Sequence, residues 1–159
     1  MTPPWRLLGT PGTEARGQAA GLVLDTNVLI LAERRVGDRT TRPDFSPGSA
    51  YGQVSISAAT ASELLVGVHR AAGEARRIQR SAFVEATLAA MPILDVNLEA
   101  ARVHARIKAA LQARGQTLGA NDLVIAATAP AGGHAALTTD VDDFGRAPGP
   151  EVLAFPLAA

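Results

Sequence analysis

Short apolar runs alternate with longer stretches of helical spacing along this chain, which predicts strands joined by helices. Runs of strand length and composition occupy residues 21–25, 53–57, 91–95, 135–138 and 151–155. Apolar residues recur with helical spacing over residues 26–35, 58–72, 74–90, 97–114 and 119–129. Strands that alternate with helices imply βαβ units. We therefore expect an α/β fold in which a five-stranded parallel sheet is covered by helices.

Turn and cap residues set the expected boundaries of these elements. Ser57 is a good N-cap for the second helix and Gly73 a good stop for it, while Asn97 or Asp95 would cap the fourth helix. Residues 37–52 carry scattered prolines, glycines and charges, and we interpret them as a long loop. Residues 1–20 are interpreted as a flexible N-terminal tail and residues 21–159 as a single domain, since 159 residues fit one domain.

Composition excludes several classes of protein. The chain has no cysteine, which rules out a disulfide scaffold, a thiolate zinc site and a cysteine nucleophile. It has 15 basic and 15 acidic residues, so a uniformly basic coat for nucleic acid is absent. No apolar stretch approaches a signal-peptide core or a membrane span. We expect a cytoplasmic protein that does not associate with membranes.

Two acidic residues stand out in the first half of the chain. Asp25 directly follows a buried strand, where open α/β sheets bind ligands, although capping the next helix is an equally good explanation. Glu63 lies in a helix of small and apolar residues, with Gly67 and Arg70 on the same face. A weak surface pair between Glu63 and Arg70 would also explain it. Gly67 suggests that another group approaches this face closely.

Further carboxylates follow in the second half. Asp122 lies in the first turn of an otherwise apolar helix, where the helix dipole alone would favour it. Asp140, Asp142 and Asp143 follow the fourth predicted strand, and the last two are also good turn residues. Together these loops and helices can bring several carboxylates to one edge of the sheet. Such a cluster repels itself unless a cation neutralises it, and oxygen-only ligands favour Mg²⁺ or Mn²⁺. A metal-bound water could then attack a phosphodiester.

The acidic residues lie in four motifs, which in chain order are LDTNVL (24–29), SELLVG (62–67), NDLVIAA (121–127) and TTDVDDF (138–144). In this order the motifs resemble those of the PIN-domain ribonucleases, specifically the VapC-type toxins of bacterial toxin–antitoxin pairs. The resemblance implies that Asp25, Glu63, Asp122 and Asp140 form a metal-binding acidic quartet. It further implies that Asn27 and Thr138 support that quartet by hydrogen bonding.

The same resemblance carries expectations about fold and activity. It implies a PIN-like three-layer α/β/α sandwich around the five-stranded parallel sheet. It also implies Mg²⁺- or Mn²⁺-dependent endonucleolytic cleavage of RNA that inhibits translation, formation of a homodimer, and neutralisation by a VapB-like antitoxin. The target (tRNA, rRNA or mRNA) stays open, as does the choice among Asp140, Asp142 and Asp143 for the fourth acid.

Other hypotheses remain beside this one. A catalytically silent PIN-like module would bind an antitoxin or RNA without cutting. A magnesium-dependent phosphatase would need a second Asp where Asn27 stands, and a receiver-like domain would need a late lysine, whereas Lys108 is the only one. Substrate attraction would have to come from local arginines, for which the candidates are Arg34, Arg35, Arg70, Arg76, Arg77 and Arg80. The histidines at 69, 104 and 134 are interpreted as surface or packing residues.

Overall fold

The computed structural model describes residues 19–36 and 52–155. Most of the predicted tail (1–20) and of the predicted loop (37–52) therefore lies outside the described residues. The strands are β1 (Gly21–Leu24), β2 (Gln53–Ser57), β3 (Ile93–Leu94), β4 (Ala135–Thr138) and β5 (Val152–Ala154). The helices are α1 (Thr26–Val36), α2 (Ala58–His69), α3 (Glu74–Ala90), α4 (Leu98–Ala113), α5 (Ala120–Ala131) and α6 (Val141–Gly145).

The strands form a single five-stranded sheet in the order β3-β2-β1-β4-β5, and every pairing is parallel. β1 is central, with Leu24 in register with Ile56 of β2 on one side and Leu137 of β4 on the other. The chain first builds outward from β1 through β2 to β3, and then returns to place β4 and β5 on the opposite side. This reversal puts a topological switch point between β1 and β4, where open α/β sheets form their binding crevices.

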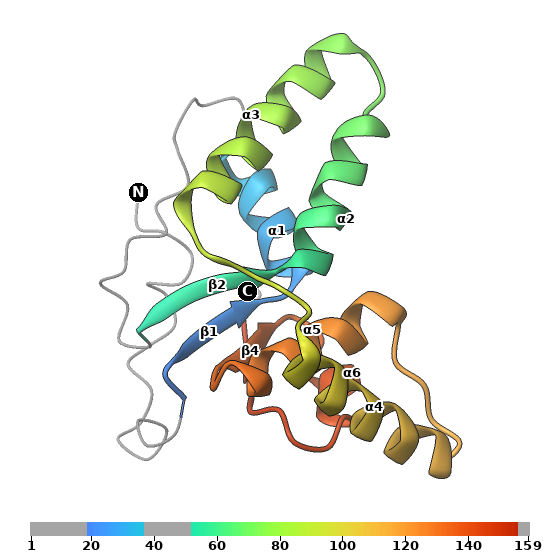
Figure 1. The fold of residues 1–159 in the computed structure, drawn as a ribbon. Coiled ribbons are helices and arrows are strands. Elements are labelled where there is room, and N and C mark those ends of the chain that lie inside the picture. The colour runs from blue at the N-terminus through green and yellow to red at the C-terminus, as the bar shows by residue number, and fades with distance from the viewer. Residues whose placement is uncertain (1–18, 37–51, 156–159) are drawn as a thin grey trace.

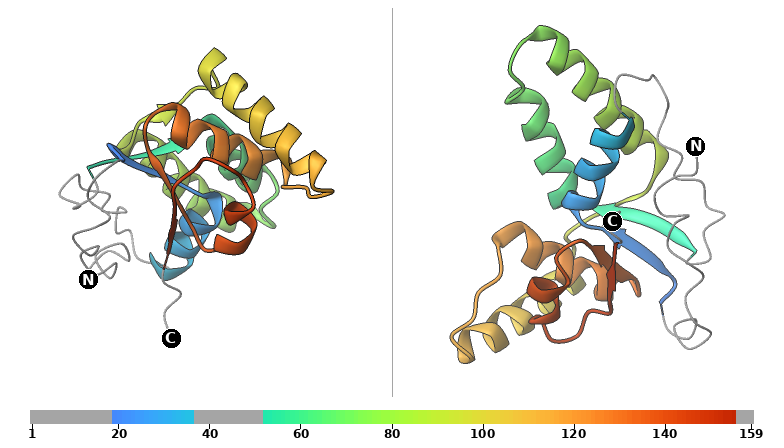
Figure 2. Two further views of the ribbon diagram at one scale, coloured as in Figure 1. Left: turned by 90° about the horizontal axis from the view of Figure 1, so that it is seen from below. Right: turned by 180° about the vertical axis from the view of Figure 1, so that it is seen from behind.

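Helices cover both faces of the sheet, as Figures 1 and 2 show. Leu22 and Leu24 of β1 pack with α1, α2 and α3 in one core, whereas Val23, which points the other way, packs with α4 and α5 in a second core. Because successive strand residues face opposite sides, a strand that is apolar throughout requires cover on both. The predicted three-layer α/β/α sandwich is thereby confirmed.

Several boundaries differ from those expected. α2 ends at His69, four residues before Gly73, and Gly73 instead precedes α3 with a φ of +85°, a conformation that favours glycine. β3 is reduced to two residues at the sheet edge. Asn97 is the N-cap of α4, because its side chain accepts from the amide of Ala100 at 2.9 Å. The short helix α6 was not predicted at all.

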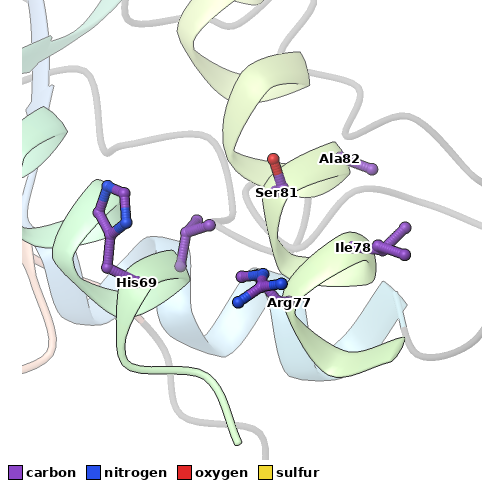
Figure 3. A pocket seen from close by; sticks show the side chains of 6 residues that line it. His69, Arg77, Ile78, Ser81 and Ala82 are labelled. Carbon is purple, nitrogen blue, oxygen red and sulfur yellow. The ribbon is translucent and has the colours of Figure 1, made fainter. Parts of the chain in front are cut away.

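Helices α2 and α3 pair as a hairpin that extends away from the sheet (Figures 1 and 2). Near its tip it carries a shallow groove lined by Val68, His69, Arg77, Ile78, Ser81 and Ala82 (Figure 3). None of the acidic residues singled out above lines this groove. Among the described helices, none combines the length and apolar character needed to cross a membrane.

Candidate active site

Asp25 lies directly at the carboxyl end of β1 and is 1% exposed. Its backbone amide donates to the carbonyl of Leu137 at 2.9 Å, which continues the β1–β4 ladder to the switch point. Its carboxylate accepts the Thr138 hydroxyl at 2.7 Å and the backbone amides of Thr26 and Asn27. The capping interpretation and the site interpretation are therefore compatible, because the same carboxylate serves the start of α1 and faces β4.

Burial raises the pKa of Asp25 above its ordinary value. The hydrogen bonds from Thr138 and the two backbone amides oppose that rise, and the charge of Glu63 adds to it. The effect of burial is the largest of these, so the protein maintains this carboxylate against a free-energy cost.

Glu63 projects from α2 and is held by residues of two other helices. The Thr26 hydroxyl, at the start of α1, donates to Oε2 of Glu63. The side-chain amide of Asn121, at the start of α5, donates to Oε1 at 2.6 Å. Arg70, the partner that a surface pair would need, is the C-cap residue of α2 and forms no ion pair with Glu63 among the described residues. Glu63 therefore belongs to the same region as Asp25.

Gly67 is contacted by the side chain of Arg80, but not closely. Arg80 of α3 donates to the Gly67 carbonyl at 3.2 Å and pairs with Glu33 of α1 at 2.9 Å. A Cβ added at Gly67 would lie 3.7 Å from Cδ of Arg80, which is ordinary contact. The expectation that Gly67 marks a close approach is thus wrong in its steric part, since alanine would fit.

Asp122 is half-buried in the first turn of α5. Burial and then the charges of Asp25, Glu63, Asp140 and Asp143, in that order, raise its pKa to about 6. The acids from β1, α2 and the segment after β4 therefore all contribute to raising the pKa of Asp122. That Asp25, Glu63, Asp122 and Asp140 share one metal site stays a prediction.

Asp140 opens α6, where its side chain accepts the amide of Asp143 at 3.2 Å. Its own amide donates to Thr138 Oγ1 at 2.9 Å, so Thr138 links Asp140 to Asp25 through one hydroxyl. Asp143 is paired with Arg146, and Asp142 is exposed. Of the three acids after β4, Asp140 is thus the one joined to Asp25 by hydrogen bonds.

The supporting residues differ partly from those expected. Thr138 supports Asp25 as the resemblance implied, but Asn27 is exposed and contributes its backbone amide. Thr26 and Asn121 hold Glu63, a role that the sequence did not assign to them. Both stand inside the quoted motifs, immediately beside Asp25 and Asp122, and this adjacency was the available signal.

Some predicted arginines are engaged elsewhere. Arg77 pairs with Glu74, and Arg80 with Glu33. Arg34, Arg70 and Arg76 are exposed, while the side chain of Arg35 lies outside the described residues. His69 lines the hairpin groove, and burial lowers the pKa of His134, whose Nδ1 has no partner among the described residues.

The carboxylates of Asp25, Glu63, Asp122 and Asp140 are chemically suited to a hard divalent cation. Their positions, however, do not form a ready-made coordination site. All candidate ligands are carboxylate oxygens, the kind that Mg²⁺ and Mn²⁺ prefer. Burial and, after it, the charges of nearby acids raise the pKa of Asp122, and a bound cation would offset both effects. Within the described residues, no three Asp, Glu or His side chains lie in positions that would hold an ion together. Carboxylates that repel one another are expected to stay apart until a cation draws them in.

Comparison with known proteins identifies the family to which this chain belongs. The PIN domain family model matches residues 22–150, and the chain therefore belongs to the PIN domain family. The family expected from the four motifs is confirmed, which removes the phosphatase and receiver alternatives.

The relatives that resemble this chain in sequence include VapC proteins. Ribonuclease VapC1 of Rickettsia felis is 40% identical over 133 residues, covering 84% of this chain and 95% of the relative. Ribonuclease VapC5 of Mycobacterium tuberculosis is 40% identical over 127 residues, covering 79% and 86%.

Solved structures agree with this placement. The DNA-bound VapBC structure from Salmonella typhimurium matches with a TM-score of 0.73 and 26% identity, over 86% of this chain and 98% of that one. The VapBC-5 structure from Mycobacterium tuberculosis matches with a TM-score of 0.65 and 34% identity, over 87% and 99%.

Proposed function

We propose that this chain is an Mg²⁺- or Mn²⁺-dependent endoribonuclease, a VapC-type toxin that cleaves RNA by phosphodiester hydrolysis and so inhibits translation in the cytoplasm. The observation that carries the proposal is the arrangement at the switch point, where the Thr138 hydroxyl links Asp25 to Asp140 and Asn121, the neighbour of Asp122, holds Glu63. The pKa of Asp122, raised to about 6 by burial and by the charges of four other acids, supports it. Repelling carboxylates at a switch point are costly for the fold, and a divalent cation offsets that cost. The names of the VapC relatives support the choice of RNA as substrate.

The residues have separable roles in this proposal. Asp25, Asp122 and Asp140 would hold the metal, and Glu63 would help to bind it or to orient a water. When bound, Mg²⁺ or Mn²⁺ would lower the pKa of a bound water and neutralise charge on the scissile phosphate. Thr138 keeps Asp25 and Asp140 together through one hydroxyl. Asn121 and Thr26 restrict how the Glu63 carboxylate can turn.

The partners are proposed on the strength of the solved relatives. Several of the matching structures are VapBC complexes, in which a VapC chain is accompanied by VapB. We accordingly propose a VapB-like antitoxin as the partner that neutralises this chain, and a homodimer as its assembly. The specific RNA, whether tRNA, rRNA or mRNA, is left open.

The test compares the wild-type chain with Asp25→Asn on total RNA, with Mg²⁺ or Mn²⁺ present and again after EDTA. Loss of an outer partner of a metal ligand typically costs about 10- to 100-fold in activity, so loss of a ligand should cost at least that. We expect cleavage by the wild type, none after EDTA, and at least about a 100-fold loss in the variant, with its circular dichroism spectrum retained.

The control is Asp142→Asn, which changes an exposed acid of the same segment. It should cut at the wild-type rate. Cleavage by the purified wild-type chain that persists at the same rate after EDTA and in Asp25→Asn would contradict the proposal, since the activity would not depend on this metal site. A wild-type chain that binds RNA or antitoxin but never cuts would establish the catalytically silent module instead.

A further inference from the structure

A row of buried hydroxyl groups lies beneath Glu63. Ser57, Thr60 and Thr26 are 0%, 0% and 7% exposed. The Ser57 and Thr60 hydroxyl oxygens are 3.3 Å apart, and those of Thr60 and Thr26 are also 3.3 Å apart. Thr26 in turn contacts Oε2 of Glu63. The row therefore runs without a break from the end of β2 to the carboxylate.

Counting hydrogens fixes the direction of this row. A hydroxyl group donates one hydrogen, and an ionised carboxylate only accepts. The hydrogen of Thr26 is therefore used on Glu63, so the hydrogen between Thr26 and Thr60 must come from Thr60. By the same reasoning the hydrogen between Thr60 and Ser57 comes from Ser57. Every donor then points toward Glu63, an arrangement in which each bond strengthens the next.

Helix capping does not account for the Thr60 hydroxyl. The N-cap of α2 is completed by Ser57 Oγ and the backbone amide of Thr60, 3.1 Å apart. The buried threonines within α3 and α5 bond to the carbonyl four residues earlier, as Thr87 does to Phe83 at 2.9 Å and Thr128 to Val124 at 2.7 Å. Thr60 instead directs its hydroxyl across to another helix.

We infer that Ser57, Thr60 and Thr26 form a one-way hydroxyl relay that positions Glu63 for metal binding, with Thr60 as a positioning residue that never touches the metal. The inference rests on the proposed function and extends it to residues behind the acidic edge. The relay fixes Oε2 of Glu63 from α1, while Asn121 fixes Oε1 from α5. Loss of the relay frees the carboxylate to rotate, so that metal binding must order it again.

The experiment measures Mn²⁺ affinity by isothermal titration calorimetry on the full chain. Thr60→Val removes the hydroxyl while keeping the shape of the side chain, and we expect it to weaken Mn²⁺ binding about 3- to 10-fold, the equivalent of one buried hydrogen bond. Thr60→Ser keeps the hydroxyl and should restore wild-type affinity. Thr26→Val removes the donor in direct contact with Glu63 and should weaken binding about 10- to 100-fold.

Thr87→Val is the matched control, since it deletes an equally buried hydroxyl on α3 that bonds only within its own helix. It should leave Mn²⁺ affinity unchanged, whatever its effect on the melting temperature. The relay is overturned if Thr60→Val and Thr87→Val bind Mn²⁺ alike, or if Thr60→Ser fails to restore binding. If the wild type neither binds Mn²⁺ nor cleaves RNA, the proposed function fails and the relay with it.

A second measurement needs no variant. In the wild-type chain with labelled threonine, the hydroxyl protons of Thr26 and Thr60 should exchange slowly enough with water to be seen by NMR, because both groups are buried and donating. Fast exchange of both protons would contradict the relay even if Thr60→Val failed to fold.

Discussion

Asp25 is buried and Asp122 is half-buried, and the groups that surround the two carboxylates differ. Asp25 is the more buried and receives the Thr138 hydroxyl and two backbone amides. For Asp122, burial and the neighbouring negative charges all act in the same direction. Asp25 is thus a partly compensated carboxylate built into the sheet, because its hydrogen bonds oppose but do not cancel the effect of burial, and Asp122 is an uncompensated one at the start of a helix.

The largest expected difference between these acids is in folding stability. Asp25→Ala leaves the Thr138 hydroxyl and two helix-start amides without their acceptor, and should lower the free energy of unfolding by about 2–3 kcal/mol even after the burial cost of the carboxylate is relieved. Asp122→Ala removes a carboxylate that both burial and neighbouring charges disfavour, and it should not destabilise the metal-free chain. Urea unfolding with EDTA present measures both. Equal destabilisation by the two substitutions would end the distinction between compensated and uncompensated acids.

The second expected effect depends on pH. Because the pKa of Asp122 in the folded chain is raised from 3.8 to about 6, the folded chain binds this proton more tightly than the unfolded one. The cost of ionisation is absent below pH 3.8, grows as pH rises, and is complete above about pH 6. Asp122→Asn should therefore be more stable than the wild type at pH 7.5 in EDTA, on the order of 1 kcal/mol after solvent screening, and equal to it at pH 3.5.

Adding Mn²⁺ should reverse that order at pH 7.5. The wild type gains stability by binding the ion, about 1.4 kcal/mol at a concentration ten times the Kd, whereas Asp122→Asn gains less because it has lost a ligand. Melting temperatures with and without Mn²⁺ supply the readout. A variant that is less stable than the wild type in EDTA at pH 7.5 would show that Asp122 is compensated after all.

The fold shows which strands and helices could be predicted from the sequence. Apolar runs such as residues 21–24 and 135–138 predicted the central strands, since only a strand covered on both faces is apolar throughout. The run at 91–95 is equally apolar but lies at the sheet edge, where only Ile93 and Leu94 pair. Helix α6 escaped prediction because five residues of VDDFG carry no periodic pattern. Local pattern thus located all five strands, but it overestimated the length of the edge strand β3 and missed the short helix α6.

For the site, the sequence singled out the acids and, through the family resemblance, Thr138, but not the contacts that hold Glu63. Each acid stands out locally, after a strand or within an apolar helix. The contacts of Glu63 with Thr26 and Asn121 join residues 37 and 58 positions apart, and Thr138 is 113 positions from Asp25. Side-chain hydrogen bonds of that range depend on the packing of whole helices, which no local pattern encodes. Gly67 shows the opposite error, in which a local anomaly suggested a close contact that the packing does not require.

The smallest expected effect on stability is that of substituting Asp140. At this residue helix capping and metal binding can be tested separately, whereas Asp25 combines both roles. Its side chain accepts the Asp143 amide at the start of α6, so Asp140→Ala should cost about 0.5–1 kcal/mol through loss of that cap. Asp140→Asn keeps an acceptor oxygen and should preserve the stability, yet it removes a charge and should weaken Mn²⁺ binding. Chemical unfolding and Mn²⁺ titration of both variants, with Asp142→Asn as the control, test this. If Asp140→Asn bound Mn²⁺ as tightly as the wild type, Asp140 would be a cap alone, and the acidic edge would have to hold its metal through Asp25, Glu63 and Asp122.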